Sequence, residues 1–335
     1  MANIREVAEH AGVSPSTVSR VMNGSKSVDN ELRKRVMDAV DQLKYAAKEK
    51  NQTGARLKVG IIASKYSGQS MQAHPAIYTV ITSFIHMLEE NNIDNILLLI
   101  DDDDIDEIES YFNNLLDGYL IIGTSPTQED AILDYFRKNK TPYIIINRWI
   151  HKPYINYVNI DDMSAAYLAT THLIKQNHRK IAYIGGNKEY RHSELRLLGY
   201  KKAMKENDVD VPPNLIFQGE YSEKYGYEAG KSLFSMIDKP TAAFTAGDLI
   251  AIGLQSYVYE HGFFIPNDLS LVTFGSISPS PFSRPKLTAI DIPFREMGEQ
   301  AATALIMQMN VKKVVGIQIL MDAPLNIRES TKKID

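Results

Sequence analysis

Apolar positions near the N-terminus repeat with the spacing of a short α-helix. Four of them follow the i, i+3, i+4, i+7 pattern that places side chains in one stripe: Ile4, Val7, Ala8 and Ala11. Asn3 stands just before this stripe and is suited to cap the helix by accepting a hydrogen bond. Gly12 follows the stripe, where a glycine lets the chain turn tightly. The pattern therefore predicts a short helix that ends in a turn at Gly12.

A second short helix is predicted directly after this turn. Ser14 is a suitable N-cap, and Pro15 fits the first helical position because an N–H there would have no partner. Val18, Val21 and Met22 share the inward face. The outward face carries short polar side chains and one arginine: Ser16, Thr17, Ser19, Arg20 and Asn23. Such a face can contact base edges and phosphates, so the two helices indicate a helix-turn-helix that binds DNA.

A third helix and a linker follow. The helix begins at Asp29, a suitable N-cap, and its apolar face consists of Leu32, Val36, Ala39, Val40 and Leu43. Three helices give a DNA-binding head over residues 1–45. Residues 46–56 read AAKEKNQTGAR, which is polar, lacks apolar periodicity and contains a glycine. This segment is predicted to be a hinge or linker.

From Leu57 onward, short apolar runs alternate with amphipathic helical patterns. The apolar runs, expected as strands, cover residues 59–63, 96–100, 119–122, 143–146, 181–184, 242–245 and 269–274. The helical patterns cover residues 77–90, 107–116, 131–138, 165–175, 196–206, 225–237 and 250–261. Near-continuous apolar strands that alternate with helices predict an α/β fold with parallel sheets covered on both faces.

The pattern further predicts that this core, residues 57–335, has two doubly wound lobes. Crossings between two sheets are expected near residues 156–162 and 285–293. Lobe one would then contain residues 57–157 and 290–325, and lobe two residues 160–285. Doubly wound lobes bind ligands at the carboxyl ends of their strands, so a ligand is expected between the lobes.

Composition excludes several classes of protein. The chain has 335 residues, which suits two or three domains, and its 44% apolar and 23% charged content is ordinary for a globular protein. It has no cysteine, so neither a disulfide nor a thiolate metal site is expected. We predict no metal and no cofactor. The absence of an N-terminal apolar segment and of long apolar runs predicts a cytoplasmic protein without membrane contact.

The charges are distributed unevenly between the head and the core. The net charge is −4, but residues 1–56 hold 10 Lys/Arg against 7 Asp/Glu, a net of +3. The remaining residues hold 27 against 34, a net of −7. A basic head on an acidic body is expected when only the head meets phosphate.

Residues 12–24, GVSPSTVSRVMNG, resemble the N-terminal module of the LacI/GalR family of bacterial sugar-responsive repressors. Further strings extend the resemblance over nearly the whole chain: ATTHLIKQNHRKIAYIGG at 169–186, RLLGY at 196–200, GYEA at 226–229, AGDLIAIG at 246–253 and GFFIPNDLS at 262–270. The resemblance implies a homodimeric repressor whose core resembles periplasmic sugar-binding proteins. It also implies a small sugar or glycoside effector that changes affinity for a DNA operator.

On the DNA side, Arg20 is the first candidate, because an arginine that donates two hydrogen bonds to guanine is the commonest specific contact. Ser16 and Thr17 are neighbouring candidates, and Pro15 can contact a thymine methyl group. Ser19 can equally bind phosphate or act as a cap. The further candidates are Asn3, Ser14 and Asn23, the last with the same alternative as Ser19. Two heads of a dimer would read a near-palindromic double-stranded operator.

In the core, the resemblance implies that Arg196 holds oxygen atoms of the effector, for which a guanidinium fork is suited. Its alternative is a surface arginine on a helix. The resemblance also implies that Tyr221 stacks on the effector, because an aromatic ring suits the apolar face of a sugar. Weaker candidates are Asp161, Asn147, His192, Asp248 and His74. Asp248 can instead cap a helix, and Trp149 can line the cleft or pack between the lobes.

Three departures from the family pattern stand out. Gly247 replaces a common asparagine, and Gly275 replaces a common aspartate. The loss of two polar ligand contacts predicts either a bulkier ligand, such as an oligosaccharide or glycoside, or a different effector chemistry. The hinge lacks the family's Pro-Asn and Ala-x-x-Leu strings. A leucine that inserts into the minor groove therefore has no place in this sequence.

Two other classes of function compete with the regulator. A transport-type sugar-binding protein would need a signal peptide and would not need the head. An α/β enzyme that processes sugars or nucleotides would carry a recognisable motif, but GxSxG, P-loop, HExxH and GxGxxG patterns are all missing. The sequence favours a DNA-binding regulator that is not an enzyme.

Overall fold

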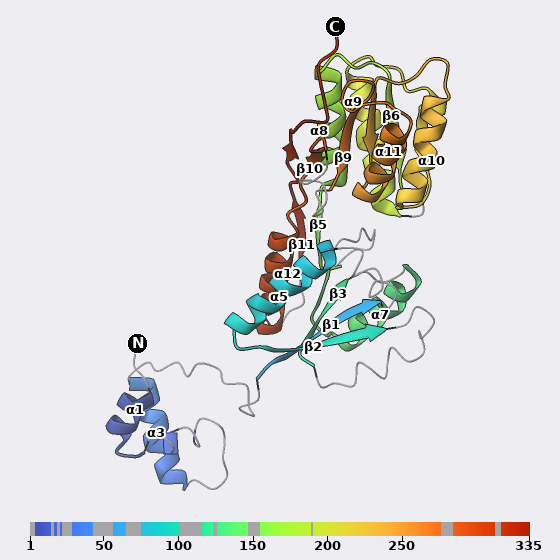
Figure 1. Ribbon diagram of the computed structural model, residues 1–335. Coiled ribbons are helices and arrows are strands. Elements are labelled where there is room, and N and C mark those ends of the chain that lie inside the picture. The colour runs from blue at the N-terminus through green and yellow to red at the C-terminus, as the bar shows by residue number, and fades with distance from the viewer. Residues whose placement is uncertain are drawn as a thin grey trace. The chain divides into compact units, whose positions relative to one another are not determined.

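The chain forms two units with separate cores, Met1–Arg56 and Leu57–Asp335 (Figure 1). The computed structural model describes residues 4–14, 17–18, 21, 29–42, 56–64, 75–100, 116–122, 126–146, 155–188, 190–275, 284–311 and 316–335. The predicted hinge lies outside the described residues, apart from Arg56, and so does most of the helix expected over 107–116. No helix among the described residues is long and apolar enough to cross a membrane.

The head is built on two helices, α1 (Ile4–Ala11) and α3 (Asn30–Gln42), that share a small apolar core. The residues of this core are Val7, Ala8, Ala11, Val18, Val21, Val36, Ala39 and Val40. Gly12 has a φ of +64°, a left-handed conformation that ends α1 and is natural for glycine. Arg35 on α3 donates to the carbonyl oxygen of Ala11 at 2.7 Å, which satisfies an acceptor at the end of α1.

The first sheet of the core is entirely parallel, with the order β11-β5-β4-β3-β1-β2. Its strands are β1 (Lys58–Ser64), β2 (Asp94–Ile100), β3 (Gly118–Ile122), β4 (Tyr143–Ile146), β5 (Tyr157–Ile160) and β11 (Gln318–Met321). Its helices are α5 (Pro75–Glu90), α7 (Pro126–Asn139) and α12 (Phe294–Asn310). Ile61 packs in the core cluster of α5 and α12, whereas its neighbour Ile62 packs in the cluster of α7. The helices therefore cover opposite faces, because neighbouring residues of a strand point to opposite faces.

The second sheet has the order β12-β10-β9-β8-β6-β7, and β12 is its one antiparallel strand among the described residues. The strands are β6 (Ile181–Gly185), β7 (Ile216–Gln218), β8 (Ala242–Thr245), β9 (Ser270–Phe274), β10 (Thr288–Ile290) and β12 (Leu325–Asn326). The helices are α8 (Asp162–Lys175), α9 (Arg191–Glu206), α10 (Glu223–Phe234) and α11 (Asp248–Glu260), with a short 3₁₀ helix at Pro213–Leu215. Figure 1 shows this layered arrangement around β6 and β9.

The strand orders confirm the prediction of doubly wound parallel sheets. The prediction omitted β5, β7, β10, β11, β12 and α12. The omitted strands are only two to four residues long, and β7, β11 and β12 lie at sheet edges with partly exposed side chains. Short, half-exposed strands do not produce a continuous apolar run. The buried face of α12 contains Gly298, Ala301, Ala302 and Ala304, small residues that give a weak periodic signal.

Glycines explain two of the sequence strings, because they let α10 and α11 approach closely. A Cβ on Gly226 would lie 2.1 Å from the carbonyl oxygen of Ile250, and one on Gly253 would lie 1.8 Å from that of Glu223. Both distances are impossible for any other residue without moving backbone. The strings GYEA and AGDLIAIG therefore contain the glycines at which α10 and α11 contact each other.

The chain crosses between the two sheets three times, after β5, β10 and β11. Two crossings fall where the sequence predicted them, and the third, at residues 322–324, was not predicted. The crossing segments are hydrogen-bonded to one another. Asp161 N–H donates to the Met321 carbonyl at 3.0 Å, and Asp291 N–H donates to the Pro324 carbonyl at 2.8 Å.

Two buried histidines fasten the C-terminal segment to the second sheet. The His172 ring lies 3.0 Å from the Thr331 hydroxyl. The His178 ring lies 2.8 Å from the Thr241 hydroxyl and 3.1 Å from the Lys332 carbonyl. Burial lowers the pKa of both rings, with Lys175 adding to the effect at His172. Both histidines are therefore neutral in the folded core near neutral pH.

A lowered pKa in the folded state means that the unfolded chain binds more protons, so stability is lost as pH falls. We expect the free energy of unfolding to be constant above pH 7 and to fall, below the ordinary histidine pKa of about 6.5, by up to about 1.4 kcal/mol per pH unit for each of the two rings. His178→Gln should reduce this slope, because only His172 then takes up an extra proton on unfolding. Urea titrations from pH 5 to 8 measure the slopes; equal slopes in wild type and His178→Gln would refute the assignment.

Candidate DNA-binding and effector sites

In the head, the structure shows how Ser14 begins the second helix. Thr17 N–H donates to the Ser14 hydroxyl at 3.2 Å and to the Ser14 carbonyl at 2.9 Å, as expected for an N-cap. Ser14 is exposed and Thr17 half-buried, while Val18 and Val21 are buried. The other DNA candidates lie outside the described residues: Asn3, Pro15, Ser16, Ser19, Arg20 and Asn23.

In the second sheet, the order of the strands defines where a ligand site is expected. The chain runs from β6 to β7 on one side of β6 and then to β8 on the other side. Ligands of doubly wound sheets bind at the carboxyl ends of the strands where the order reverses, here beside β6 and β8. Gly186 directly follows β6, and Gly247 lies between β8 and α11. We call the space between these two glycines the switch-point crevice.

Arg196 projects from α9 and is fixed by three groups. Its Nε donates to Asp162 Oδ1 at 2.7 Å, and its Nη1 donates to the carbonyl oxygen of Ala246 at 2.7 Å. Its Cζ lies 3.7 Å from the ring centroid of Phe274. The side chains of Arg196 and Asp162 are 8% and 2% exposed, so the alternative of a surface arginine is wrong.

The protonation of this pair follows from its surroundings. Burial alone would lower the pKa of Arg196, but the carboxylate of Asp162 and the nearby Tyr221 outweigh it and raise the pKa. The guanidinium therefore stays charged throughout the usual pH range, and Asp162 offsets its charge.

Tyr221 follows β7 in the loop before α10, and its ring lies in the switch-point crevice. A Cβ on Gly186 would lie 2.0 Å from the ring, and one on Gly247 would lie 2.8 Å from it. The Tyr221 hydroxyl lies 2.7 Å from the hydroxyl of Ser193, a fully buried residue of α9. Burial raises the pKa of Tyr221, although Arg196 and the Ser193 hydrogen bond oppose the rise. The phenol therefore stays protonated.

The two altered glycine positions are explained by their neighbours. The Tyr221 ring occupies the space beside Gly247. Gly275 has a φ of +101°, which an L side chain rarely adopts, and its Cβ would lie 2.9 Å from Asp248 Oδ2. Asp248 itself is 5% exposed and lies in the first turn of α11, where the helix dipole favours a carboxylate.

The remaining effector candidates have different positions. Asp161 caps α8, because its carboxylate accepts from Ser164 N–H at 2.9 Å and from the Ser164 hydroxyl at 2.6 Å. His192 lies between the rings of Tyr190 and Tyr221, with centroid distances of 5.4 and 5.5 Å. The structure thus brings His192, Tyr221 and Arg196 together. His74 and Asn147, like Trp149, lie outside the described residues.

Three residues of this site were not identified from the sequence: Asp162, Ser193 and Phe274. Asp162 gave one signal, since it stands beside Asp161 at the start of a helix and a buried carboxylate needs a cationic partner. The partner depends on how α8 packs against α9, which a single sequence does not show.

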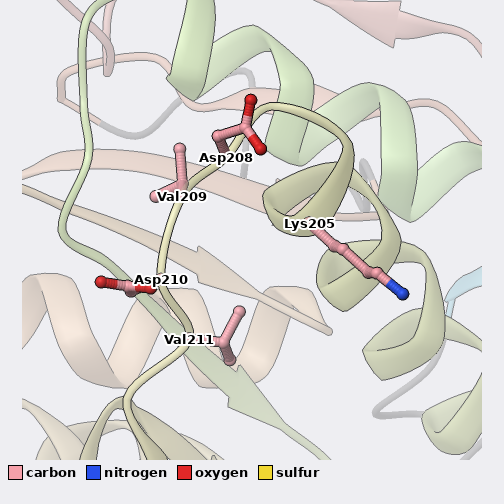
Figure 2. Close-up of a pocket in the computed structure, with 5 residues that line it drawn as sticks. All are labelled: Lys205, Asp208, Val209, Asp210 and Val211. Atoms are coloured by element: carbon pink, nitrogen blue, oxygen red, sulfur yellow. The ribbon is translucent and has the colours of Figure 1, made fainter.

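A separate surface depression follows α9 and is lined by Lys205, Asp208, Val209, Asp210 and Val211 (Figure 2). Lys205, Asp208 and Asp210 are exposed, and Figure 2 shows Lys205 and Asp210 pointing away from each other. Ligand sites have polar groups that converge, so this depression is a solvated turn.

Comparison with known proteins identifies the family. Residues 3–48 match the model "Bacterial regulatory proteins, lacI family", and residues 170–331 match "Periplasmic binding protein-like domain". The HTH-type transcriptional repressor PurR of Haemophilus influenzae (strain PittEE) is 31% identical over 347 residues, covering 100% of both chains. The chain belongs to the LacI family of bacterial regulatory proteins. It is therefore a transcriptional regulator with a helix-turn-helix head, not an enzyme.

Solved structures show the same fold. A complex of the transcriptional regulator CelR with cellobiose is 24% identical, covers 98% of this chain and 100% of CelR, and has a TM-score of 0.74. A lac repressor dimer bound to operator and the anti-inducer ONPF is 23% identical, covers 99% of each chain, and has a TM-score of 0.71. These likenesses confirm the predicted α/β core of this LacI-family member.

The buried pair predicts a measurable stability effect. Asp162→Asn leaves the buried charge of Arg196 without its counter-charge, and we expect a loss of about 3 kcal/mol in the free energy of unfolding. Asp134→Asn removes the partner of Arg137 from a pair whose side chains are 63% and 71% exposed, so this control should lose less than about 1 kcal/mol. Urea denaturation measures both; equal losses would contradict the role of burial.

Proposed function

We propose that this regulator is a repressor of a carbohydrate-utilisation operon and that a small sugar or glycoside, bound between the lobes of the core, switches its operator affinity. The observation that carries the effector site is the buried Arg196–Asp162 pair at the carboxyl ends of β6 and β8. The CelR–cellobiose complex supports a sugar as the ligand class. The proposed contacts are Arg196, Tyr221, His192, Asp248, Gly275 and Asp161, with His74 and Asn147 added from the sequence.

The charge of the site favours a neutral effector. Asp162 lies 2.7 Å from the Arg196 guanidinium, so the pair offers no net charge to an anionic ligand. A phosphorylated sugar would have to be desolvated without gaining a counter-charge from this pair. Hydroxyl groups need only hydrogen-bond donors and acceptors, which the pair supplies.

A homodimer is proposed because β2 is an edge strand with an apolar exposed side. Its residues Ile96, Leu97 and Leu99 are 45%, 43% and 39% exposed, and β2 pairs with β1 alone among the described strands. Exposed apolar edge strands are normally covered. We propose that a second copy of the chain covers β2. The operator-bound lac repressor dimer supports this assembly.

The DNA-binding proposal is tested by selecting genomic fragments with the purified protein. We expect a near-palindromic site, because two heads of a dimer present the same surface twice. Arg20→Ala should weaken binding to that site by about 10- to 100-fold, the usual value of a bidentate base contact. Arg137→Ala, in the core, should leave binding unchanged. Recovery of no enriched fragment, or of a site without symmetry, would contradict the proposed dimeric repressor.

The effector proposal is tested by thermal-shift titration with cellobiose, ribose and glucose 6-phosphate. We expect a neutral sugar to raise the melting temperature and glucose 6-phosphate to have no effect. Arg196→Lys keeps the charge but loses the fork, and it should weaken the sugar's binding about tenfold or more. Arg191→Ala, which removes a half-buried arginine paired with Glu194 in the first turn of α9, is the control. Full affinity in Arg196→Lys, or preference for the phosphate, would refute the assignment.

A further inference from the structure

The switch-point crevice is already filled by a side chain of the protein. The Tyr221 ring lies against Gly186 at one strand end and against Gly247 at the next. These strand ends flank the position where doubly wound folds place a ligand. The ring thus occupies the place that an effector in contact with Arg196 would take.

The ring is the nearest obstacle to a side chain at both glycine positions. Neither glycine has a positive φ, so the backbone at both positions is accessible to any residue. The nearest atoms that a Cβ would meet at these two positions belong to the Tyr221 ring, at 2.0–2.6 Å for Gly186 and at 2.8–3.1 Å for Gly247. The two glycines and the ring are therefore one complementary set.

The ring is held in place by hydrogen bonds of its hydroxyl to Ser193 and Arg196 and by packing. Its hydroxyl lies 2.7 Å from Ser193 Oγ, and His192 lies beside it at 5.5 Å between ring centroids. Tyr221 belongs to the loop before the N-cap Ser222 of α10, so its side chain can rotate without unfolding a strand or a helix. These features suit a movable plug.

We propose that Tyr221 is a gate of the effector site: its ring closes the switch-point crevice and must swing out before an effector reaches Arg196. This inference rests on the proposed effector function. It reverses the role expected from the sequence, where Tyr221 is a platform that attracts the ligand. If Tyr221 is a gate, displacing the ring costs part of the free energy of effector binding. Removing the ring therefore strengthens effector binding.

The direction of the change in sugar affinity distinguishes a gate from a platform at Tyr221. Tyr221→Ala should bind the neutral sugar that stabilises the wild type, with cellobiose as the first probe, more tightly than wild type does. Tyr221→Phe keeps the ring but loses the hydrogen bonds of the hydroxyl to Ser193 and Arg196, and it should bind about fivefold more tightly. Weaker sugar binding by both variants would overturn the gate in favour of the platform.

A second measurement does not depend on the effector. Tyr221→Ala removes a phenol-shaped group, so added phenol should refill the crevice and raise the melting temperature of this variant. Phenol should not stabilise the wild type or Tyr190→Ala, since Tyr190 is 38% exposed and leaves no cavity. Absence of the phenol effect in folded Tyr221→Ala would overturn the placement of the ring.

If Tyr221→Ala does not fold, Gly247→Ala is a second variant that tests the gate. The new methyl group pushes against the ring, so this variant should lower stability and tighten sugar binding at once; unchanged or weaker sugar binding would refute the gate. In the Tyr221→Ala background, the stability loss from Gly247→Ala should disappear. If no sugar binds the wild type, the effector proposal fails. The phenol measurement and the stability of Gly247→Ala with and without Tyr221→Ala still decide whether the ring fills the crevice.

Discussion

The buried ion pair between Arg196 and Asp162 is the interaction on which the geometry of the second sheet's site depends. It joins α9 to the first residue of α8, and the same guanidinium reaches the carbonyl after β8 and the ring at the end of β9. Removing two charges from water is expensive, and only close contacts of this kind offset the loss. Because the guanidinium contacts four elements at once, these elements have little freedom to shift independently. The contacts that fix Arg196 are consequently formed before any ligand arrives.

The crevice beside this pair shows how substitutions at one site depend on each other. Gly247 is suited to this chain because Tyr221 fills the neighbouring space, and Gly275 is suited because its backbone is left-handed beside the Asp248 carboxylate. Each position would appear as a loss of a polar ligand contact if considered alone. Considered with their neighbours, both glycines are required by steric contact within the protein. The site therefore differs from the family pattern as a packed unit.

The sequence predicted the strands that are buried on both faces, such as β1, β3 and β6, since they give continuous apolar runs. It did not predict β7 or β12, because three or two half-exposed residues carry no periodic signal. Arg196 and Tyr221 are candidates because of the family resemblance. Their actual partners, Asp162 and Ser193, come from helices whose packing is set by tertiary contacts. Likewise, the sequence predicts Asp161 as a ligand contact and does not show that its carboxylate caps α8.

Asp161 and Asp162 together connect the site to the crossings between the two sheets. The Asp161 N–H is bonded to the Met321 carbonyl of the third crossing, and its side chain fixes the first turn of α8. The next residue, Asp162, holds Arg196. A displacement of Arg196 therefore acts on α8 at its capped end, one peptide bond from a crossing strand. Control by a ligand requires that the ligand has different affinities for two arrangements of the core. Because the Asp161 N–H binds the crossing segment and the neighbouring Asp162 carboxylate binds Arg196, two adjacent residues connect the crossing to the site.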